Sequence, residues 1–430
     1  MYTYTGRDLL PHLRQIFTDT PGFLRQAAQT HGDLVAFKVG GIQVYLVNHP
    51  DAIRRVLQDN HRNYSKDTIQ YNTLAAVTGR GLLTSDGDQW FRNRRLEQPA
   101  FSRPRLANLD EIIHPALTAM LSRWSEQAGA VLDIDREMMA VTLEIVGKAL
   151  FSFDLRTQAP RLTAAVLTAL DHVIYKAQKM ITPPDWVPTA HNLAFKRALR
   201  ELDAAVFEVL VERRRQGSAG GDLLDMLLAA RDEETGLGLS DAQLRDEIIT
   251  LLIAGHETVA SALTWSFYLL AQHPQQQAQL EQEADSLGGR LPGYADLDAL
   301  PFAQQVFSEA LRLYPPAWLI TRKAIGADTL CAETIPAGAL LVISPYVIHR
   351  HPEYWPQADQ FVPGRFAEAE RSWPRYAYVP FGGGPRLCIG NHFAQIEAVQ
   401  ILTAVTQRFH LSLESDQIIL ADPLVTLRPR

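Results

Sequence analysis

The stretch Phe381-Gly-Gly-Gly-Pro-Arg-Leu-Cys-Ile-Gly390 decides how this chain is interpreted. It places Cys388, one of only two cysteines, in a glycine-rich loop. Apolar residues then recur at helical spacing, at Phe393, Ile396, Val399 and Leu402. The pattern predicts a tight loop that opens a helix, with the cysteine at the helix N-terminus. There the helix dipole and the free N–H groups favour a thiolate over a thiol.

A thiolate in this position is a suitable axial ligand for haem iron, and Arg386 adds a cation for a cofactor that carries carboxylates. Three other kinds of site fit less well. A buried structural cysteine suits Cys388 taken alone but leaves the surrounding decapeptide unexplained. A dinucleotide-binding loop requires a preceding strand and a distant acidic residue, and a phosphate-binding loop requires Gly-Lys-Ser/Thr, which is absent.

The pattern F-G-G-G-x-R-x-C-x-G resembles the haem-binding loop of the cytochrome P-450 family, the haem-thiolate monooxygenases. The resemblance implies haem b, iron protoporphyrin IX, with the thiolate of Cys388 as the metal ligand. It implies that Phe381 and Arg386 also contact this cofactor. The implied fold is mainly α with a smaller β-rich region, and one long central helix crosses the haem.

The length, composition and net charge of the chain limit the class of protein. With 430 residues, of which 47% are hydrophobic, we expect a single haem domain over residues 1–430 with no fused reductase, since no flavin or iron–sulfur segment is visible. A formal charge of −7 argues against nucleic acid as a partner. Two cysteines suit a reducing cytoplasm. Without a leader-like start or a long uninterrupted apolar run, we expect no integral membrane anchor and a soluble, bacterial type of protein.

Local patterns predict the main elements. Leu34–Val39 and Ile42–Val47 flank a glycine turn and predict a strand pair, and most segments from residue 50 to 215 look helical. After Pro315 short strands and Pro/Gly loops are expected, with a final hairpin between 410 and 428. A long buried helix is predicted from Ser240 to Gln272, because Ser240 and Gln243 form a capping box and His273-Pro274 supplies a stop.

Polar residues interrupt the apolar middle of that helix at Ala254-Gly255-His256-Glu257-Thr258. Taken alone, they fit a kinked core helix with a back-bonded threonine. The string also resembles the family's A-G-x-D/E-T element, which lies over the distal haem face. The resemblance implies that Ala254 contacts the cofactor, that Thr258 bonds oxygen at the haem, and that Glu257 relays protons. A zinc-protease motif is excluded, because position 260 is alanine instead of the second histidine.

Several charged residues complete the resemblance. Glu309-Ala-Leu-Arg312 matches the family's E-x-x-R helix, and Arg365 is the expected third member of that structural group. Trp90-Phe-Arg-Asn-Arg94 matches the W-x-x-x-R element, and Arg322 stands at another usual place for a haem propionate partner. The resemblance therefore implies that Trp90, Arg94 and Arg322 bind the cofactor, although any one arginine alone is more often an ordinary surface charge.

Electrons are expected from a separate ferredoxin or flavodoxin and its NAD(P)H-dependent reductase. A basic cluster is the expected docking patch or, equally, a solvated charged face: Arg92, Arg95, Arg103 and Arg105. The enzymatic alternatives are a peroxide-driven peroxygenase and a hydroperoxide isomerase, and a non-enzymatic haem sensor is the third.

The substrate is expected to be lipophilic, because the predicted pocket is mostly apolar. That pocket comprises Ile69, Tyr71, Leu74, Leu251, Ala254, Ala317–Leu319 and Tyr175–Ile181. The strings Ala254–Phe267, Glu309–Arg322 and Thr78–Trp90 are similar to a bacterial branch that includes a β-carotene hydroxylase. The expected reaction is therefore hydroxylation or epoxidation of a carotenoid, terpenoid or fatty acid.

Overall fold

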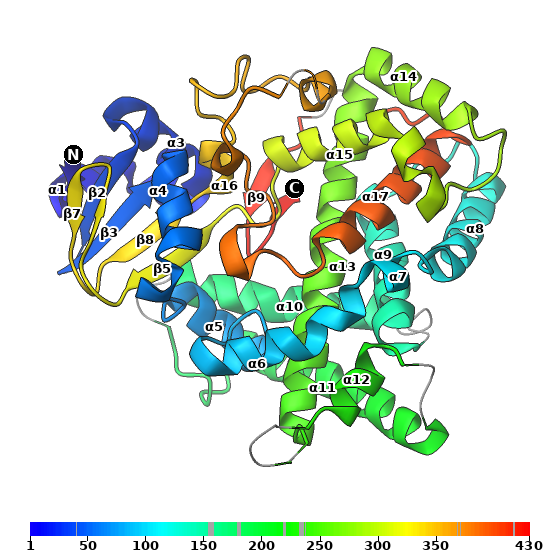
Figure 1. The fold of residues 1–430 in the computed structure, drawn as a ribbon, viewed down its shortest axis with the longest axis horizontal. Helices are drawn as coiled ribbons and strands as arrows, with labels where there is room; N and C mark the ends of the chain where they lie inside the picture. The colour runs from blue at the N-terminus through cyan, green and yellow to red at the C-terminus, as the bar shows by residue number, and fades with distance from the viewer. Residues whose placement is uncertain are drawn as a thin grey trace. The chain divides into compact units, whose positions relative to one another are not determined.

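The computed structural model describes all 430 residues except 40, 154–158, 179–181, 218–220, 232–235, 237, 368, 370, 416 and 417. The described chain is mainly helical with a smaller β-rich part, as predicted (Figure 1). It divides into two compact units. The first comprises residues 1–72, 305–391 and 418–430, and the second comprises 73–304 and 392–417. The single haem domain expected from the sequence stays a prediction.

The first unit is built on a sheet with the strand order β1-β2-β3-β8-β5-β4 (Figure 1). Its strands are β1 (Tyr2–Tyr4), β2 (Leu34–Val39), β3 (Ile42–Val47), β4 (Tyr64–Ser65), β5 (Ile320–Ala324) and β8 (Leu340–Ile343). The predicted strand pair is confirmed as the antiparallel pair β2–β3. Strand β8 then joins β3 in parallel, which unites segments about 300 residues apart in the sequence.

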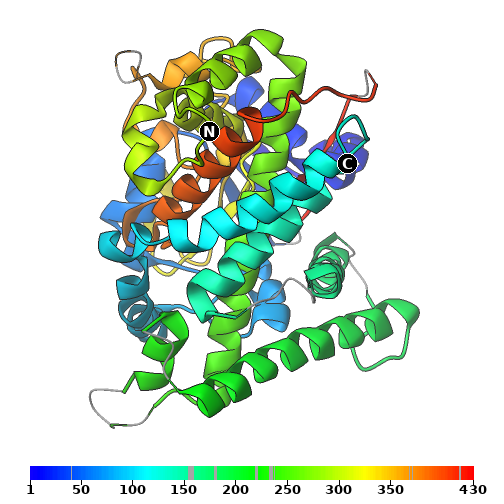
Figure 2. The ribbon, with the colours of Figure 1, turned by 90° about the vertical axis from the view of Figure 1, so that its right-hand side faces the viewer.

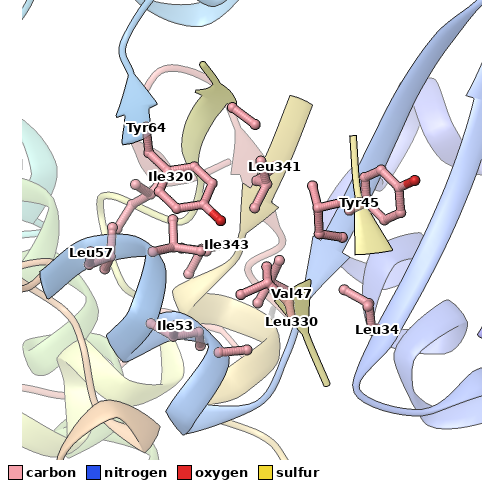
Figure 3. Close-up of a cluster of buried hydrophobic side chains, with 14 of the residues drawn as sticks. Leu34, Tyr45, Val47, Ile53, Leu57, Tyr64, Ile320, Leu330, Leu341 and Ile343 are labelled. Atoms are coloured by element: carbon pink, nitrogen blue, oxygen red, sulfur yellow. The ribbon is translucent and has the colours of Figure 1, made fainter. Parts of the chain in front are cut away.

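Both faces of this sheet are buried, because alternate side chains of a strand point to opposite sides. On one face Leu34 and Ala36 belong to the same buried cluster as Ile53 of helix α4 (Pro50–Arg54), and Figure 3 labels Leu34 and Ile53 within this cluster. On the other face Val35 and Phe37 pack with residues of helix α3 (Thr20–His31). A helix on each side therefore fixes the sheet that carries β5 and β8.

The remaining elements of the first unit are short. They are α1 (Gly6–Leu9), α2 (Leu13–Thr18), α16 (Pro345–Ile348), the pair β6 (Asp328–Leu330) and β7 (Glu333–Ile335), and the pair β9 (Ala421–Pro423) and β10 (Leu427–Pro429). The last pair confirms the predicted C-terminal hairpin over a shorter span. Helices α5 (Ile69–Thr78), α15 (Pro301–Leu313) and α17 (Asn391–Thr406) cross the boundary between the units.

The second unit is helical, and α13 (Asp241–Gln272) runs through it (Figure 2). The other helices are α6 (Gly87–Glu97), α7 (Arg103–Leu106), α8 (Asp110–Glu126), α9 (Ile134–Phe151), α10 (Ala159–Gln178), α11 (Ala190–Gln216), α12 (Leu223–Ala229) and α14 (Pro274–Asp285). Helix α9 packs along α13, and α11 crosses α13 steeply in Figure 2.

The start and the end of α13 confirm the sequence prediction. The Ser240 hydroxyl accepts a bond from the Gln243 N–H at 3.3 Å, and the Gln243 Oε1 accepts from the Ser240 N–H at 2.9 Å. His273 caps the other end. By length and composition α13 is apolar enough to cross a membrane, but 83% of its most apolar window is buried inside the protein. A core helix satisfies the same criteria.

Candidate functional site

The loop that carries Cys388 is closed by its own backbone. The Cys388 N–H donates to the Phe381 carbonyl oxygen at 3.0 Å, and a short 3-10 turn spans Gly384–Arg386. Gly384 has φ +65°, and a Cβ there would lie 1.9 Å from the Leu57 carbonyl oxygen, so only glycine fits. The loop thus folds tightly and leaves the Cys388 side chain exposed.

The position of this cysteine relative to its helix differs from the expectation. Helix α17 begins at Asn391, three residues after Cys388, so the cysteine lies in the loop before the helix and not in its first turn. The reason is local: the 3-10 turn and the bond to Phe381 set the backbone before the helix begins. Arg386 is the last residue of that 3-10 turn.

Two buried cations lie close to one tyrosine, Tyr71, in the first unit. Arg322 on β5 is 5% exposed, and its Nη1 donates to the Tyr71 hydroxyl at 3.1 Å and to the Thr321 carbonyl at 2.8 Å. The Lys66 Nζ, on a residue 7% exposed, lies 5.2 Å from the Tyr71 ring centroid. Burial of a charge is costly unless an opposite charge compensates it. Among the described residues, no carboxylate lies within ion-pair distance of Arg322.

This arrangement fits a haem. A thiol on a tight glycine loop supplies the ligand type that haem iron takes in haem-thiolate proteins. Buried guanidinium and ammonium groups supply the charges that anionic propionates require. The sequence prediction included Arg322 and missed Lys66, because a single lysine in an irregular segment belongs to no periodic pattern.

The predicted E-x-x-R group is present in the first unit, and its Glu309–Arg312 pair is completely buried. The Arg312 Nε and Nη2 bond the two oxygens of Glu309 at 2.7 and 2.8 Å, and the Arg365 Nε bonds Glu309 Oε1 at 3.0 Å. Glu309 and Arg312 are each 0% exposed. Arg312 also donates to the carbonyl of His349 at 2.9 Å. The group therefore joins α15 to the segments around residues 349 and 365.

In the second unit, the polar interruption of α13 coincides with the least covered part of its buried middle. From residue 247 to 267 every residue is buried except Ala254, Gly255 and Thr258. Ala254 and Thr258 lie one turn apart on one face, and the Thr258 hydroxyl donates to the Ala254 carbonyl at 2.6 Å. Glu257 is buried at 2% exposure. The buried middle of the helix is thus partly exposed at Ala254, Gly255 and Thr258.

Gly255 has a packing reason of its own. A Cβ at this position would lie 3.1 Å from Val146 Cγ2 of α9. Next to it, the Thr142 hydroxyl donates to the His256 carbonyl at 3.2 Å. The close approach that a mid-helix glycine permits is therefore made by helix α9.

The residues predicted on the early helix lie on α6. Trp90 is 3% exposed, and Arg94 is half-buried with its Nε donating to Gln98 at 3.2 Å. The four arginines of the expected docking patch have different environments. Arg95 and Arg103 are exposed, whereas Arg92 is half-buried. Arg105 is half-buried and lines a cavity of about 590 Å³ beside Arg213 and Arg214.

The predicted cofactor and oxygen residues are thus divided between the two units. Cys388, Arg386, Phe381 and Arg322 belong to the first, whereas Trp90, Arg94, Ala254, Glu257 and Thr258 belong to the second. Of the predicted pocket, Ile69 is 62% exposed, Tyr71 and Leu74 are buried, and residues 179–181 lie outside the described residues.

Comparisons with known proteins point in one direction. The family model described as Cytochrome P450 matches residues 9–430. Cyclooctatin synthase of Streptomyces melanosporofaciens is 39% identical over 89% of this chain and 83% of its own length. Pentalenene oxygenase of Streptomyces avermitilis is 34% identical over 95% of this chain and 90% of its own. The crystal structure of CYP175A1 from Thermus thermophillus is 31% identical, with a TM-score of 0.82, and covers 100% of this chain and 97% of that one.

Proposed function

Because this chain belongs to the cytochrome P450 family and is a haem-thiolate monooxygenase, we propose that Cys388 is the thiolate ligand of its haem. The observation that supports this most directly is the Phe381–Gly390 loop, which is closed by the Cys388–Phe381 bond. In the same unit Arg322 and Lys66 would hold the propionates, together with Arg386 of the cysteine loop. Trp90 and Arg94 of α6 would add further propionate contacts.

We propose that Glu257 and Thr258 take part in proton delivery on the distal side of the haem. Bound haem supplies the activation of O2 and the transfer of one oxygen atom to the substrate. The Thr258 hydroxyl, held by the Ala254 carbonyl, offers its oxygen lone pairs to a hydrogen-bond donor on the open face of α13. Glu257, buried in the adjacent position, would hold and release protons that arrive from solvent.

We propose a lipophilic substrate of the terpenoid class. The predicted pocket residues Tyr71, Leu74 and Leu251 are buried and mostly apolar, which favours a ligand with few polar groups. Among the relatives, one is named for the oxygenation of pentalenene and another for the synthesis of cyclooctatin. Carotenoids and fatty acids remain the other members of the expected set. The reaction would be hydroxylation or epoxidation, in the cytoplasm.

We propose that electrons arrive from an acidic ferredoxin or flavodoxin, itself reduced by an NAD(P)H-dependent reductase. We assign docking to the exposed Arg95 and Arg103, together with the half-buried Arg92. The double variant R95E/R103E should slow reduction by an acidic ferredoxin severalfold at low salt and little at high salt, because screening weakens surface attraction. Equal rates of reduction for the variant and the wild type at low salt would exclude this patch as the docking site.

The haem assignment has a direct spectroscopic test. The holoprotein reduced with dithionite and saturated with carbon monoxide should show the strongly red-shifted Soret band of thiolate coordination. Cys388→Ser should lose that band, and the matched variant Cys331→Ser should keep it, because these are the two cysteines of the chain. Retention of the band in Cys388→Ser, or its loss in Cys331→Ser, would refute Cys388 as the ligand.

A further inference from the structure

Two carboxyl groups meet inside the second unit, at the junction of α6 and α13. Glu97 is the last residue of α6 and is 0% exposed, and Glu247 lies in the second turn of α13 and is 4% exposed. Asn93, one turn before Glu97 on the same face of α6, donates to Glu247, so both carboxyl groups lie where α6 meets α13, and the charge of Glu247 acts on Glu97. Neither residue belongs to the proposed haem or oxygen site.

The two carboxyls have unequal surroundings. Glu247 Oε2 accepts from the Leu82 N–H at 2.8 Å, and its Oε1 accepts from the Asn93 Nδ2 of α6. Glu97 has no such support: among the described residues, no N–H or hydroxyl group donates to either of its oxygens. An ionised Glu97 would be a buried anion facing a second anion. A protonated Glu97 instead donates its O–H to Glu247.

The charged groups near this pair do not change the conclusion that Glu97 is protonated. Burial raises the pKa of Glu97 well above its usual range and the charge of Glu247 raises it further, while Arg94 on the same helix lowers it. For Glu247, burial raises the pKa, and the bonds from Glu97, Leu82 and Asn93 lower it. Asp246, the residue before Glu247, accepts from the Arg80 N–H at 2.8 Å, and its charge raises the pKa of Glu247. Asp225 of α12 pairs with Arg213 at 2.6 Å.

We propose that Glu97 and Glu247 form a proton-binding site that holds one shared proton and, while it holds that proton, fastens α6 to α13. Loss of the proton leaves two carboxylates in contact without solvent, and their repulsion separates the C-terminal turn of α6 from α13. The site therefore acts as a latch, by which we mean a contact that holds α6 against α13 while it is protonated and releases α6 as the pH rises.

The consequence for the enzyme follows from what each helix carries. Helix α6 bears Trp90 and Arg94, and α13 bears Glu257 and Thr258. Opening of the latch would weaken haem retention at alkaline pH. This last consequence rests on the proposed function, whereas the proton site itself does not.

The test uses the holoprotein and two readouts that do not depend on activity. In infrared spectra at neutral pH, Glu97→Gln should remove one carboxylic-acid carbonyl band that the wild type shows. In hydrogen–deuterium exchange between pH 7 and pH 9, peptides from residues 87–97 should become at least tenfold less protected in the wild type than in Glu97→Gln. The glutamine amide keeps the donor to Glu247 but cannot ionise.

Asp88→Asn is the matched control, because Asp88 is an exposed acid on the same helix, and it should follow the wild type. If Glu97→Gln does not fold, Glu97→Met offers a second uncharged side chain of similar length for both readouts. The proposal is overturned if no carbonyl band disappears, or if wild type and variant exchange equally at pH 9. Loss of the red-shifted Soret band with an intact latch would instead refute only the haem assignment.

Discussion

Thr258 donates its hydroxyl to the carbonyl oxygen of Ala254, one turn earlier on α13, over 2.6 Å. This bond fixes the side chain and occupies its only proton, so the free capacity of the hydroxyl is its oxygen lone pairs. In this arrangement the Thr258 oxygen can accept a hydrogen bond but has no second proton to donate. Under the proposed function, the protons are supplied by the adjacent Glu257, which is buried.

Removal of this acceptor should uncouple oxygen consumption from product formation. With Thr258→Ala, we expect O2 uptake to continue while product formed per O2 falls several-fold, up to about the 10²-fold that a positioned proton-transfer group contributes. Thr258→Ser keeps a hydroxyl at the same place and should stay near the wild type. The measurement is product against O2 consumed, with peroxide quantified. If Thr258→Ala formed as much product per O2 as the wild type, Thr258 would have no part in proton delivery.

The buried cation on β5 should hold the cofactor. Arg322→Gln removes a charge-assisted bond to an anion, worth about 1.5–3 kcal/mol, which corresponds to on the order of 10- to 100-fold faster haem loss. The matched control is the neighbouring Lys323→Gln, whose side chain is 40% exposed and pairs with Asp67 at 2.7 Å. The readout is the rate of haem transfer to an excess of an apoprotein acceptor. Equal rates for both variants would contradict a propionate role.

The parts that sequence could predict were those with local signals. The ends of α13 follow from Ser240, Gln243 and the His273-Pro274 stop, and the Glu309–Arg312 pair follows from helical spacing. Its third member, Arg365, lies more than 50 residues later and required the family resemblance.

Other features depend on tertiary contacts that leave no local pattern. The parallel pairing of β3 with β8 joins strands about 300 residues apart. The buried Lys66 and Glu97 look like ordinary surface charges in the sequence, since neither lies in a recognisable motif. The offset of Cys388 from α17 likewise comes from a 3-10 turn that the apolar periodicity of the helix cannot reveal.

The buried Glu309 should matter far more for stability than a surface residue with the same spacing. Glu309→Gln leaves the buried Arg312 and the partly buried Arg365 without their carboxylate, and breaking a buried pair costs about 3–5 kcal/mol. Glu212 and Arg215 provide the matched E-x-x-R pair on the exposed side of α11. Glu212→Gln should leave the urea unfolding midpoint unchanged. If the urea midpoint of Glu309→Gln shifted as little as that of Glu212→Gln, the backbone carbonyl partners of Arg312 would be enough to stabilise its buried charge.

The buried His349 should make the protein sensitive to acid. Its Nε2 accepts from the Val379 N–H at 2.8 Å, which requires the neutral ring. Burial, with the charges of Arg312 and Arg350, holds its pKa well below the usual range. Below about pH 6.5 the unfolded chain therefore binds a proton that the native protein does not, so stability falls as the pH falls.

The slope from this one group is at most about 1.4 kcal/mol per pH unit between the unfolded and folded pKa values. His349→Gln keeps an acceptor for the Val379 N–H and removes the titration, so its free energy of unfolding should vary less between about pH 6.5 and about pH 5.5. The half-exposed His61 supplies the comparison variant His61→Gln. Urea unfolding at each pH gives the measurement. Parallel pH dependences for wild type and His349→Gln would show that the buried ring accepts its proton without loss of native structure.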